Sequence, residues 1–328
     1  MRQGVQAEGP CTSSVTFIST CRGGRDRYAA RTVYSISFMI RILGTFFAGL
    51  LGLAFGSFLN VCLSRWPEGE SIVRPRSHCR QCSYTLAWWE NVPLVSWLAL
   101  RGRCRKCGAW IGWRYPLVEL AIGALWADCW YEYAPSAALI ASTDAWAAAS
   151  LSMAGLGIFY WILVGLAALD SEFLWLPDAV TLPGIALGVV FTVLRGVVYV
   201  TPSLHPSAMA VFLNCAFGMI AAGGLILVIR WVYWLIRRRE GIGVGDAKLM
   251  ALLAAWLGFP EALLALFIGV VFGAGVAVAL LAFPSSRSKP GGWALEKLPL
   301  GTFVCLGGIV SGLWGEWMIA VYLSWARW

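Results

Sequence analysis

Charged side chains are scarce in this 328-residue sequence. They make up 13% of the chain, whereas soluble domains average about 25%. Apolar residues reach 59%, against about 45–50% in soluble domains. No water-soluble core of this size needs so much apolar sequence, so the composition predicts an integral membrane protein. The 19 Trp and 10 Tyr fit this interpretation, because amphipathic rings collect at both membrane interfaces.

A continuous basic surface is also missing. The formal net charge is +8, but the basic residues lie in loops between apolar runs, which is a topology signal and not a groove for phosphates. The sequence therefore predicts no nucleic-acid partner.

Apolar runs close to the roughly 20 residues needed to cross a bilayer recur along the chain. They predict an all-α polytopic membrane protein with about eight transmembrane helices. The sixth is short, with a possible hinge at Pro260. The predicted helices cover about 36–63, 116–134, 149–169, 179–200, 208–236, 246–258, 261–282 and 301–324.

Lys and Arg are unevenly distributed between these runs. They concentrate at 64–115, 237–248 and 287–297, and are missing from 135–148 and 201–207. Cytoplasmic loops carry the excess of basic residues. We therefore expect the three basic segments in the cytoplasm and both chain ends outside.

The amino-terminal segment 1–35 opposes this orientation, because it carries several arginines. It is polar and lacks helical periodicity, so we predict that it is disordered. Alternatively, translation begins at Met39. The predicted organisation is this extension, a first helix at 36–63, a cytoplasmic loop domain at 64–115 and a multi-helix membrane domain at 116–328.

Four cysteines form two C-x2-C pairs, Cys79 with Cys82 and Cys104 with Cys107. Their spacing is close to the pattern of a structural zinc site, in which two tight turns complete a closed tetrahedral shell. Two disulfides are the competing interpretation. A predicted cytoplasmic location favours zinc, because thiols stay reduced there.

Three carboxylates, Asp170, Asp178 and Asp246, lie at ends of predicted helices on the same predicted side. Ionisable groups at a membrane are costly and usually functional. Each also has a plain structural explanation. Asp178, after Pro177, is well placed to cap a helix, Asp246 has the same option, and Asp170 could be a solvated helix end. The glycines within 241–245 favour function for Asp246, because they let another backbone approach it closely.

Two carboxylates that meet across a wet cleft suit peptide hydrolysis. When like charges share a site, one group stays protonated while the other is ionised. The ionised group takes a proton from the attacking water, and the protonated group polarises the carbonyl and later protonates the leaving nitrogen. No bound cofactor is needed for this reaction.

Seven short motifs then follow in one order: Gly-Ser-Phe-Leu-Asn-Val at 56–61, Pro-Arg-Ser-His-Cys at 75–79, Trp-Glu-Asn-Val-Pro-Leu-Val-Ser-Trp at 89–97, Arg-Gly-Arg-Cys at 101–104, Arg-Tyr-Pro-Leu-Val-Glu at 114–119, Leu-Pro-Asp at 176–178 and Gly-Val-Gly-Asp-Ala-Lys-Leu at 243–249. With these motifs the chain resembles the bacterial type IV prepilin peptidases from about residue 44 to its end.

The resemblance implies an inner-membrane aspartyl protease of the Gly-x-Gly-Asp type. Such enzymes cut the leader from prepilins or pseudopilins after a glycine, then methylate the new amino terminus with S-adenosylmethionine. By motif position, the catalytic pair is Asp170 and Asp246, and the four cysteines match the family's zinc-binding loop. Supporting positions fall at Gly243, Gly245, Lys248 and Asp178. The continuation Ser171-Glu172 departs from the family pattern and leaves the substrate preference open.

Methylation has a weaker signature. No glycine-rich turn between a strand and a helix is visible, so we predict no soluble methyltransferase domain. The donor would have to use the zinc loop and the neighbouring membrane face, where Glu90, Asn91 and Arg114 are polar candidates. These three residues could equally only satisfy backbone groups.

Two other classes of function remain open at this stage. A proton-coupled transporter also carries acids in its helices, but usually near the bilayer midplane and in repeat-related helices. A non-catalytic membrane assembly factor could use the loop for docking, which would leave the glycines before Asp246 unexplained.

Overall fold

The computed structural model describes residues 24–136, 138–199, 207–238, 243–282 and 298–326. The described residues contain no β-strand, so the predicted all-α class is confirmed. The long helices are α1 (Gly24–Arg65), α3 (Arg114–Tyr133), α4 (Thr143–Phe173), α5 (Asp178–Tyr199), α6 (Ala208–Arg237), α7 (Val244–Leu257), α8 (Phe259–Ala282) and α9 (Leu300–Trp325). Three short helical segments lie between α1 and α3: η1 (Trp66–Glu68), η2 (Trp88–Asn91) and α2 (Val95–Ala99).

Each of the eight predicted runs corresponds to one long helix, but not every helix is suited to cross a bilayer. Six are long and apolar enough, namely α1, α4, α5, α6, α8 and α9. Helix α7 has only 14 residues, about 21 Å at 1.5 Å per residue, and α3 carries four charged side chains along its length. Length and composition thus qualify six of the described helices as membrane spans, and the exact count of eight stays a prediction.

The amino-terminal prediction needs a correction. Helix α1 begins at Gly24, so 24–35 is helical and not disordered, and Met39 lies within this helix. Each residue added to an existing helix gains one backbone hydrogen bond. The first helix can therefore extend through 24–35 although this segment lacks an apolar pattern. Residues 1–23 lie outside the described part of the chain.

The expected break near Pro260 lies two residues earlier. Gly258, between α7 and α8, has φ of 104°, a backbone conformation that favours glycine. Pro260 falls in the first turn of α8, where its missing N–H costs nothing.

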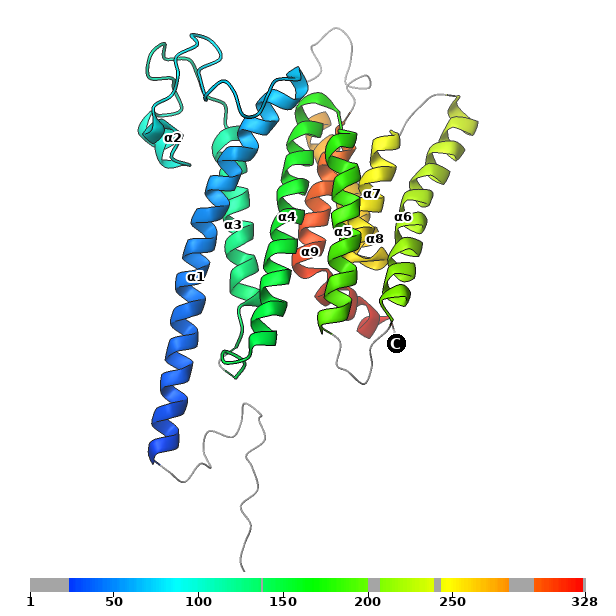
Figure 1. Cartoon of the computed structure of the whole chain (residues 1–328). Helices are drawn as coiled ribbons and strands as arrows, with labels where there is room; N and C mark the ends of the chain where they lie inside the picture. The colour runs from blue at the N-terminus through cyan, green and yellow to red at the C-terminus, as the bar shows by residue number, and fades with distance from the viewer. Residues whose placement is uncertain (1–23, 137, 200–206, 239–242, 283–297, 327–328) are drawn as a thin grey trace, which may run out of the picture.

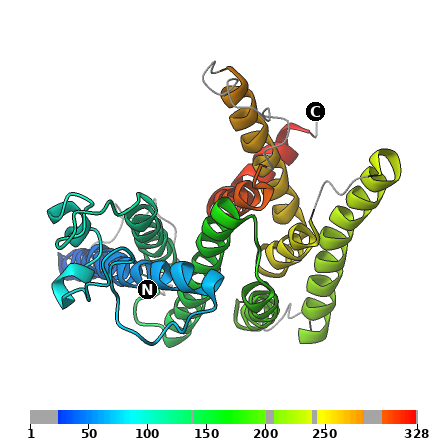
Figure 2. The same ribbon diagram turned by 90° about the horizontal axis from the view of Figure 1, so that it is seen from above.

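The helices form two groups with α4 between them. Helix α1 packs along α3 on one side of α4, and α5 and α9 contact it on the other. The view from above shows this division (Figure 2). The loop domain that contains α2 projects from the carboxyl end of α1, beyond one end of the bundle (Figure 1). The α1–α3 pair therefore joins this domain to the membrane helices.

Glycines allow the helices of each group to approach closely. An added Cβ at Gly52 of α1 would lie 2.7 Å from the Ile122 carbonyl oxygen of α3. At Gly307 of α9, a Cβ would lie 2.1 Å from the Ala265 carbonyl oxygen of α8. Small residues at such crossings maximise the van der Waals contact that holds membrane helices together.

We expect Gly307→Ala to destabilise the α8–α9 pair, because the new methyl group would force two backbones apart. Overpacking of this kind costs about 1–3 kcal/mol. The matched control is Gly275→Ala in α8, where nothing lies within 4 Å of an added Cβ. Thermal unfolding in detergent should show a lower midpoint for Gly307→Ala alone, and equal midpoints would contradict this packing.

Candidate active site and metal centre

The predicted acidic residues gather at one end of the bundle. The carboxyl end of α4 and the amino ends of α5, α7 and α9 all lie at the end from which the loop domain projects (Figure 1). Asp170 lies in the last turn of α4, Asp178 in the first turn of α5 and Asp246 in the first turn of α7. Carboxylates near the midplane, as in many transporters, are therefore not the arrangement found here.

Asp170 is buried, with 6% of its surface exposed, and is not the solvated helix end that one interpretation allowed. Its Oδ2 accepts hydrogen bonds from the Thr302 backbone N–H at 2.7 Å and lies 3.1 Å from the Thr302 hydroxyl. Both donors come from the first turn of α9, where backbone N–H groups have no partner within the helix. An added Cβ at Gly301 would lie 2.9 Å from the same oxygen, so only glycine permits this approach.

Asp246 is held by its own helix end. Its Oδ2 accepts a hydrogen bond from the Gly243 N–H at 3.1 Å, as the acidic residue of a capping box does. Gly245 packs against Leu176, where an added Cβ would lie 3.3 Å from two of its carbon atoms. Gly243 therefore caps the turn and Gly245 allows it to pack against Leu176. The close backbone approach that we expected at Asp246 is found at Asp170, where the backbone of α9 lies beside the carboxyl group.

The carboxyl groups of Asp170 and Asp246 are near enough to interact electrostatically. Both also act on the buried thiol of Cys305 in α9, so both groups border the same part of the interior. The two carboxylates that the resemblance paired therefore lie within electrostatic range of each other at this end of the bundle.

Asp178 has a different partner. Its Oδ1 forms an ion pair with the Lys248 Nζ at 2.6 Å, which links α5 to α7. The predicted N-cap role falls instead to Pro177, whose carbonyl accepts the first hydrogen bonds of α5, from the N–H groups of Val180 and Thr181. Pro177 precedes the first helical residue, which leaves the Asp178 carboxylate free to reach the neighbouring helix.

The unusual residue Glu172 connects the two groups of helices. Its Oε2 lies 2.5 Å from the Arg114 Nη1, and the Arg114 Nη2 donates to the Ser64 hydroxyl at 2.8 Å. Ser64 lies in the last turn of α1, Arg114 begins α3, and Glu172 follows Asp170 by two positions. Arg114 therefore joins the base of the loop domain to the end of α4 that carries Asp170.

Thr302 and Gly301 escaped sequence-based prediction. Neither side chain is ionisable or a usual metal ligand, so neither stands out in an apolar run. The only local signal is the position of Gly301 in the first turn of a helix that follows Pro299. Their importance follows from the packing of α9 against α4, which no local pattern encodes.

The four predicted cysteine ligands converge in the loop domain. Their Sγ atoms all lie within 4.8 Å of one another, and no other such cluster occurs among the described residues. The Cys79–Cys107 and Cys82–Cys104 Sγ distances are 3.8 Å and 3.9 Å. A tetrahedral site with Zn–S bonds of about 2.3 Å requires ligand atoms about 3.8 Å apart. The cluster therefore fits zinc, and the alternative of two disulfides is wrong because all four thiols are free.

The two C-x2-C turns have the same construction. In the first, the Ser83 N–H donates to the Cys79 carbonyl, and in the second the Gly108 N–H donates to the Cys104 carbonyl, each at 2.9 Å. Ser83 and Gly108, one position after each pair, both have positive φ. Both turns thus bend the chain so that two thiols point to one centre.

Backbone donors favour the thiolate form in the second turn. The N–H groups of Cys107 and Lys106 lower the pKa of Cys104 to about 7, because hydrogen bonds to a charged group stabilise it. His78 lies beside the first turn, but its Nδ1 is 3.0 Å from the Arg76 carbonyl and it is not part of the cluster.

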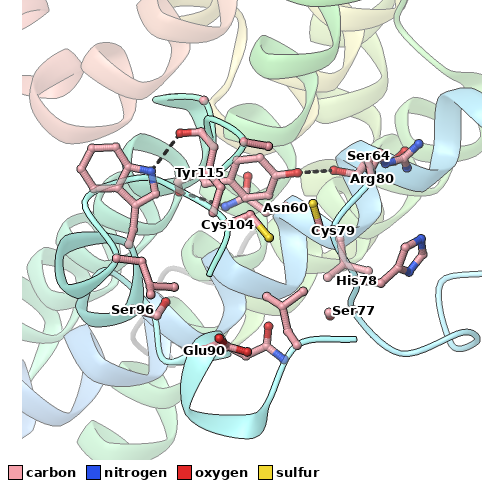
Figure 3. Close-up of a pocket in the computed structure, with 18 of the residues that line it drawn as sticks. Asn60, Ser64, Ser77, His78, Cys79, Arg80, Glu90, Ser96, Cys104 and Tyr115 are labelled. Atoms are coloured by element: carbon pink, nitrogen blue, oxygen red, sulfur yellow. Dashed lines mark hydrogen bonds between the residues drawn. The ribbon is translucent and has the colours of Figure 1, made fainter. Parts of the chain in front are cut away.

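A cavity of about 280 Å³ lies between the cysteine turns and the ends of α1 and α3 (Figure 3). Glu90 and Asn91, two of the predicted donor-binding candidates, line it, whereas Arg114 is not among its lining residues. Beneath the cavity, the Glu119 Oε2 accepts the Leu94 N–H at 2.8 Å. Leu94 has φ of 58°, so a buried carboxylate holds a strained turn ahead of α2 in place.

Comparisons with known proteins agree with this arrangement. The Bacterial Peptidase A24 N-terminal domain matches residues 50–133, and the Type IV leader peptidase family matches residues 157–278. No solved structure matches the chain.

Several curated relatives carry the name prepilin leader peptidase/N-methyltransferase. One from Myxococcus xanthus is 36% identical over 74% of this chain and 65% of its own length. One from Burkholderia pseudomallei strain 1026b is 35% identical, covering 82% of this chain and 85% of the relative. A third, from Stutzerimonas stutzeri, is 31% identical over 85% and 93%.

We expect purified protein to contain about one equivalent of zinc, because four thiols already stand at tetrahedral spacing. Cys104→Ser should lower the zinc content below half an equivalent. Cys62→Ala, which removes a buried thiol of α1 outside the cluster, should leave it unchanged. Elemental analysis measures both, and wild-type protein with less than half an equivalent of any metal would contradict the site.

Proposed function

The chain belongs to the type IV leader peptidase family and is an enzyme that cleaves and methylates prepilins, and we propose that Asp170 and Asp246 are the carboxyl pair that performs the cleavage. The observation that carries this proposal is the electrostatic interaction between two acids that are 76 residues apart in sequence and lie at the same end of the bundle on different helices.

Two like charges at such a site favour a single shared proton. In the proposed reaction, the ionised carboxylate accepts a proton from water as the water oxygen attacks the scissile carbonyl. The protonated carboxyl hydrogen-bonds to the carbonyl oxygen and then gives its proton to the leaving nitrogen.

The surroundings of Asp170 support a division of labour between its oxygens. Oδ2 is occupied by the Thr302 N–H and lies beside the Thr302 hydroxyl. Oδ1 is then the atom left for water or substrate. The backbone of α9 thereby holds the carboxyl group in one orientation. The group is then preorganised for the reaction.

Lys248 and Asp178 would act as positioning residues. Their ion pair ties the first turn of α5 to the first turn of α7, where Asp246 lies. The Lys248 side chain is about one third exposed and that of Asp178 more than half exposed. We therefore assign this pair a supporting role in placing α7.

For the loop domain we propose a structural zinc ion held by Cys79, Cys82, Cys104 and Cys107. With four thiolates the shell is closed, so the metal leaves no open position for catalysis. The ion would supply the ordering energy that so short a loop cannot obtain from a core of its own.

The enzyme would work at the cytoplasmic face of the bacterial inner membrane. The basic segments flanking the helix ends at this side favour that orientation. The loop domain and the helix ends that carry both acids lie at this one end of the bundle (Figure 1). Its partners would be prepilins or the pseudopilins of a secretion system, presented from the bilayer, with S-adenosylmethionine as the methyl donor.

We expect Asp170→Asn and Asp246→Asn each to lower prepilin cleavage by at least about 100-fold, because general acid–base catalysis contributes about 10²–10⁴. The control is Asp144→Asn, an exposed acid at the opposite end of α4, which should cleave normally. Cleavage of a prepilin peptide in detergent measures all three, and unchanged cleavage by both active-site variants would refute the proposal.

We also expect Thr302→Val to lower kcat/KM for cleavage about tenfold, since a hydrogen bond to a charged group contributes about 1.5–3 kcal/mol. Thr302→Ser keeps the hydroxyl and should retain most activity. Equal rates for the two variants in the same assay would show that the hydroxyl does not orient Asp170.

A further inference from the structure

We propose that the loop domain docks on anionic lipid headgroups beside the helix bundle, through the outer face of α2 and the basic residues that follow it. The outer surface of the loop domain is defined as Val95, Leu98, Arg101, Arg103 and Trp110, all of which are exposed. This role goes beyond cleavage and methylation, and it does not depend on which carboxylates perform the cleavage.

Helix α2 has one face inside the domain and one face outside it. On the inner side, the Trp97 Nε1 donates to the Ile111 carbonyl at 3.1 Å, and the ring centroids of Trp97 and Trp113 lie 4.6 Å apart. Val95 and Leu98 are three positions apart, which places them on the same side of a helix. They are 62% and 68% exposed, so the described part of the chain leaves this apolar face largely uncovered.

The charge around this face has a single sign. The segment 91–118 contains no acidic residue and five basic ones, namely Arg101, Arg103, Arg105, Lys106 and Arg114. All but Arg114 are exposed. Arg103 forms an isolated antiparallel bridge with Trp110, so the two side chains lie next to each other. Four exposed cations thus border the apolar side chains without a compensating acid in the same segment.

The outer surface also lies at the height where a bilayer meets the protein. Helix α2 is level with the first turn of α3, on the side of the α1–α3 pair that faces away from α4 (Figure 1, Figure 2). Trp113 immediately precedes α3, and Leu117 in the first turn of α3 is 60% exposed. The apolar surface of the domain therefore continues onto the exposed side of α3, which packs along the membrane-spanning helix α1.

Anionic headgroups match both parts of this surface. The cytoplasmic leaflet, on which the loop domain is proposed to lie, has a negative surface potential, and each Lys or Arg close to it strengthens attachment about fivefold. Exposed Trp rings and aliphatic side chains enter the boundary between headgroups and acyl chains. A second copy of this chain is a poorer occupant, because a two-fold contact would bring the same cations against one another.

The bilayer gives the loop domain a third point of support. Its covalent connections are the end of α1 at Arg65 and the start of α3 at Arg114, and these two helices pack side by side. Two neighbouring connections leave a domain free to tilt about them. A contact between α2 and the headgroups removes that freedom.

The test uses full-length, zinc-loaded protein in nanodiscs, with the photoreactive residue p-benzoylphenylalanine in place of Leu98. In phosphatidylglycerol nanodiscs, illumination should attach lipid to the peptide that carries the probe, and mass spectrometry measures the attached fraction. The same probe in place of Leu120, an exposed residue of α3, is the reference for a position that faces lipid.

Arg101→Gln combined with Arg103→Gln should lower the lipid-attached fraction at position 98 at least about fivefold, without changing it at position 120. The matched control is Arg237→Gln combined with Arg238→Gln at the exposed end of α6, on the opposite side of the bundle (Figure 1). This control should leave both fractions unchanged. Zinc content and prepilin cleavage report that the variants fold.

Equal lipid attachment at position 98 with and without the two loop-domain substitutions would overturn the docking, as would attachment at position 120 alone. Cross-links from position 98 to prepilin or to a second copy, in place of lipid, would assign the surface to a protein partner and overturn it too. Unmodified protein gives an independent measurement. The N–H groups of Leu98 and Leu100 should exchange hydrogen more slowly in phosphatidylglycerol than in phosphatidylcholine nanodiscs, and equal rates would contradict the proposal.

Discussion

The contact between the first turn of α9 and the buried Asp170 organises the end of the helix bundle where the acidic residues gather. Backbone N–H groups at a helix start need acceptors, and a carboxylate withdrawn from water needs donors. The approach requires a glycine beside the carboxyl group, so Gly301, Thr302 and Asp170 act as a unit. This contact joins α9, the last of the described helices, to α4, which lies between the two groups of helices.

A second polar connection joins the loop domain to that end. Arg114 bonds to both Glu172 and Ser64, and Arg80 of the first cysteine turn donates to the Ser64 carbonyl and pairs with Glu68. The first cysteine turn and the end of α4 that carries Asp170 are therefore linked by short side-chain contacts. An enzyme that cuts and then methylates one chain end benefits from such proximity, because the product need not leave before the second reaction.

The loop domain has almost no core of its own. Its order comes from two repeated turns around four thiols, from buried Glu119 holding the strained Leu94, and from tryptophan rings in edge-on and tilted contact. Such a domain depends on its cysteine turns and on the helices that it packs against. The groups around the cavity at its base are therefore held from several directions at once.

Local signals in the sequence, namely apolar run length and C-x2-C spacing, predict the helices and the cysteine cluster, and the family resemblance of the motifs pairs Asp170 with Asp246. Helix packing alone brings Thr302 and Gly301 against Asp170, Asp178 against Lys248, and Asn60 of α1 into one cavity with Glu90. These features arise where helices distant in sequence pack together, and a side chain's partner across such a contact depends on the geometry of both helices. An uncharged residue such as Thr302 has no local sequence pattern that predicts its partner, because the contact exists only once the two helices have packed.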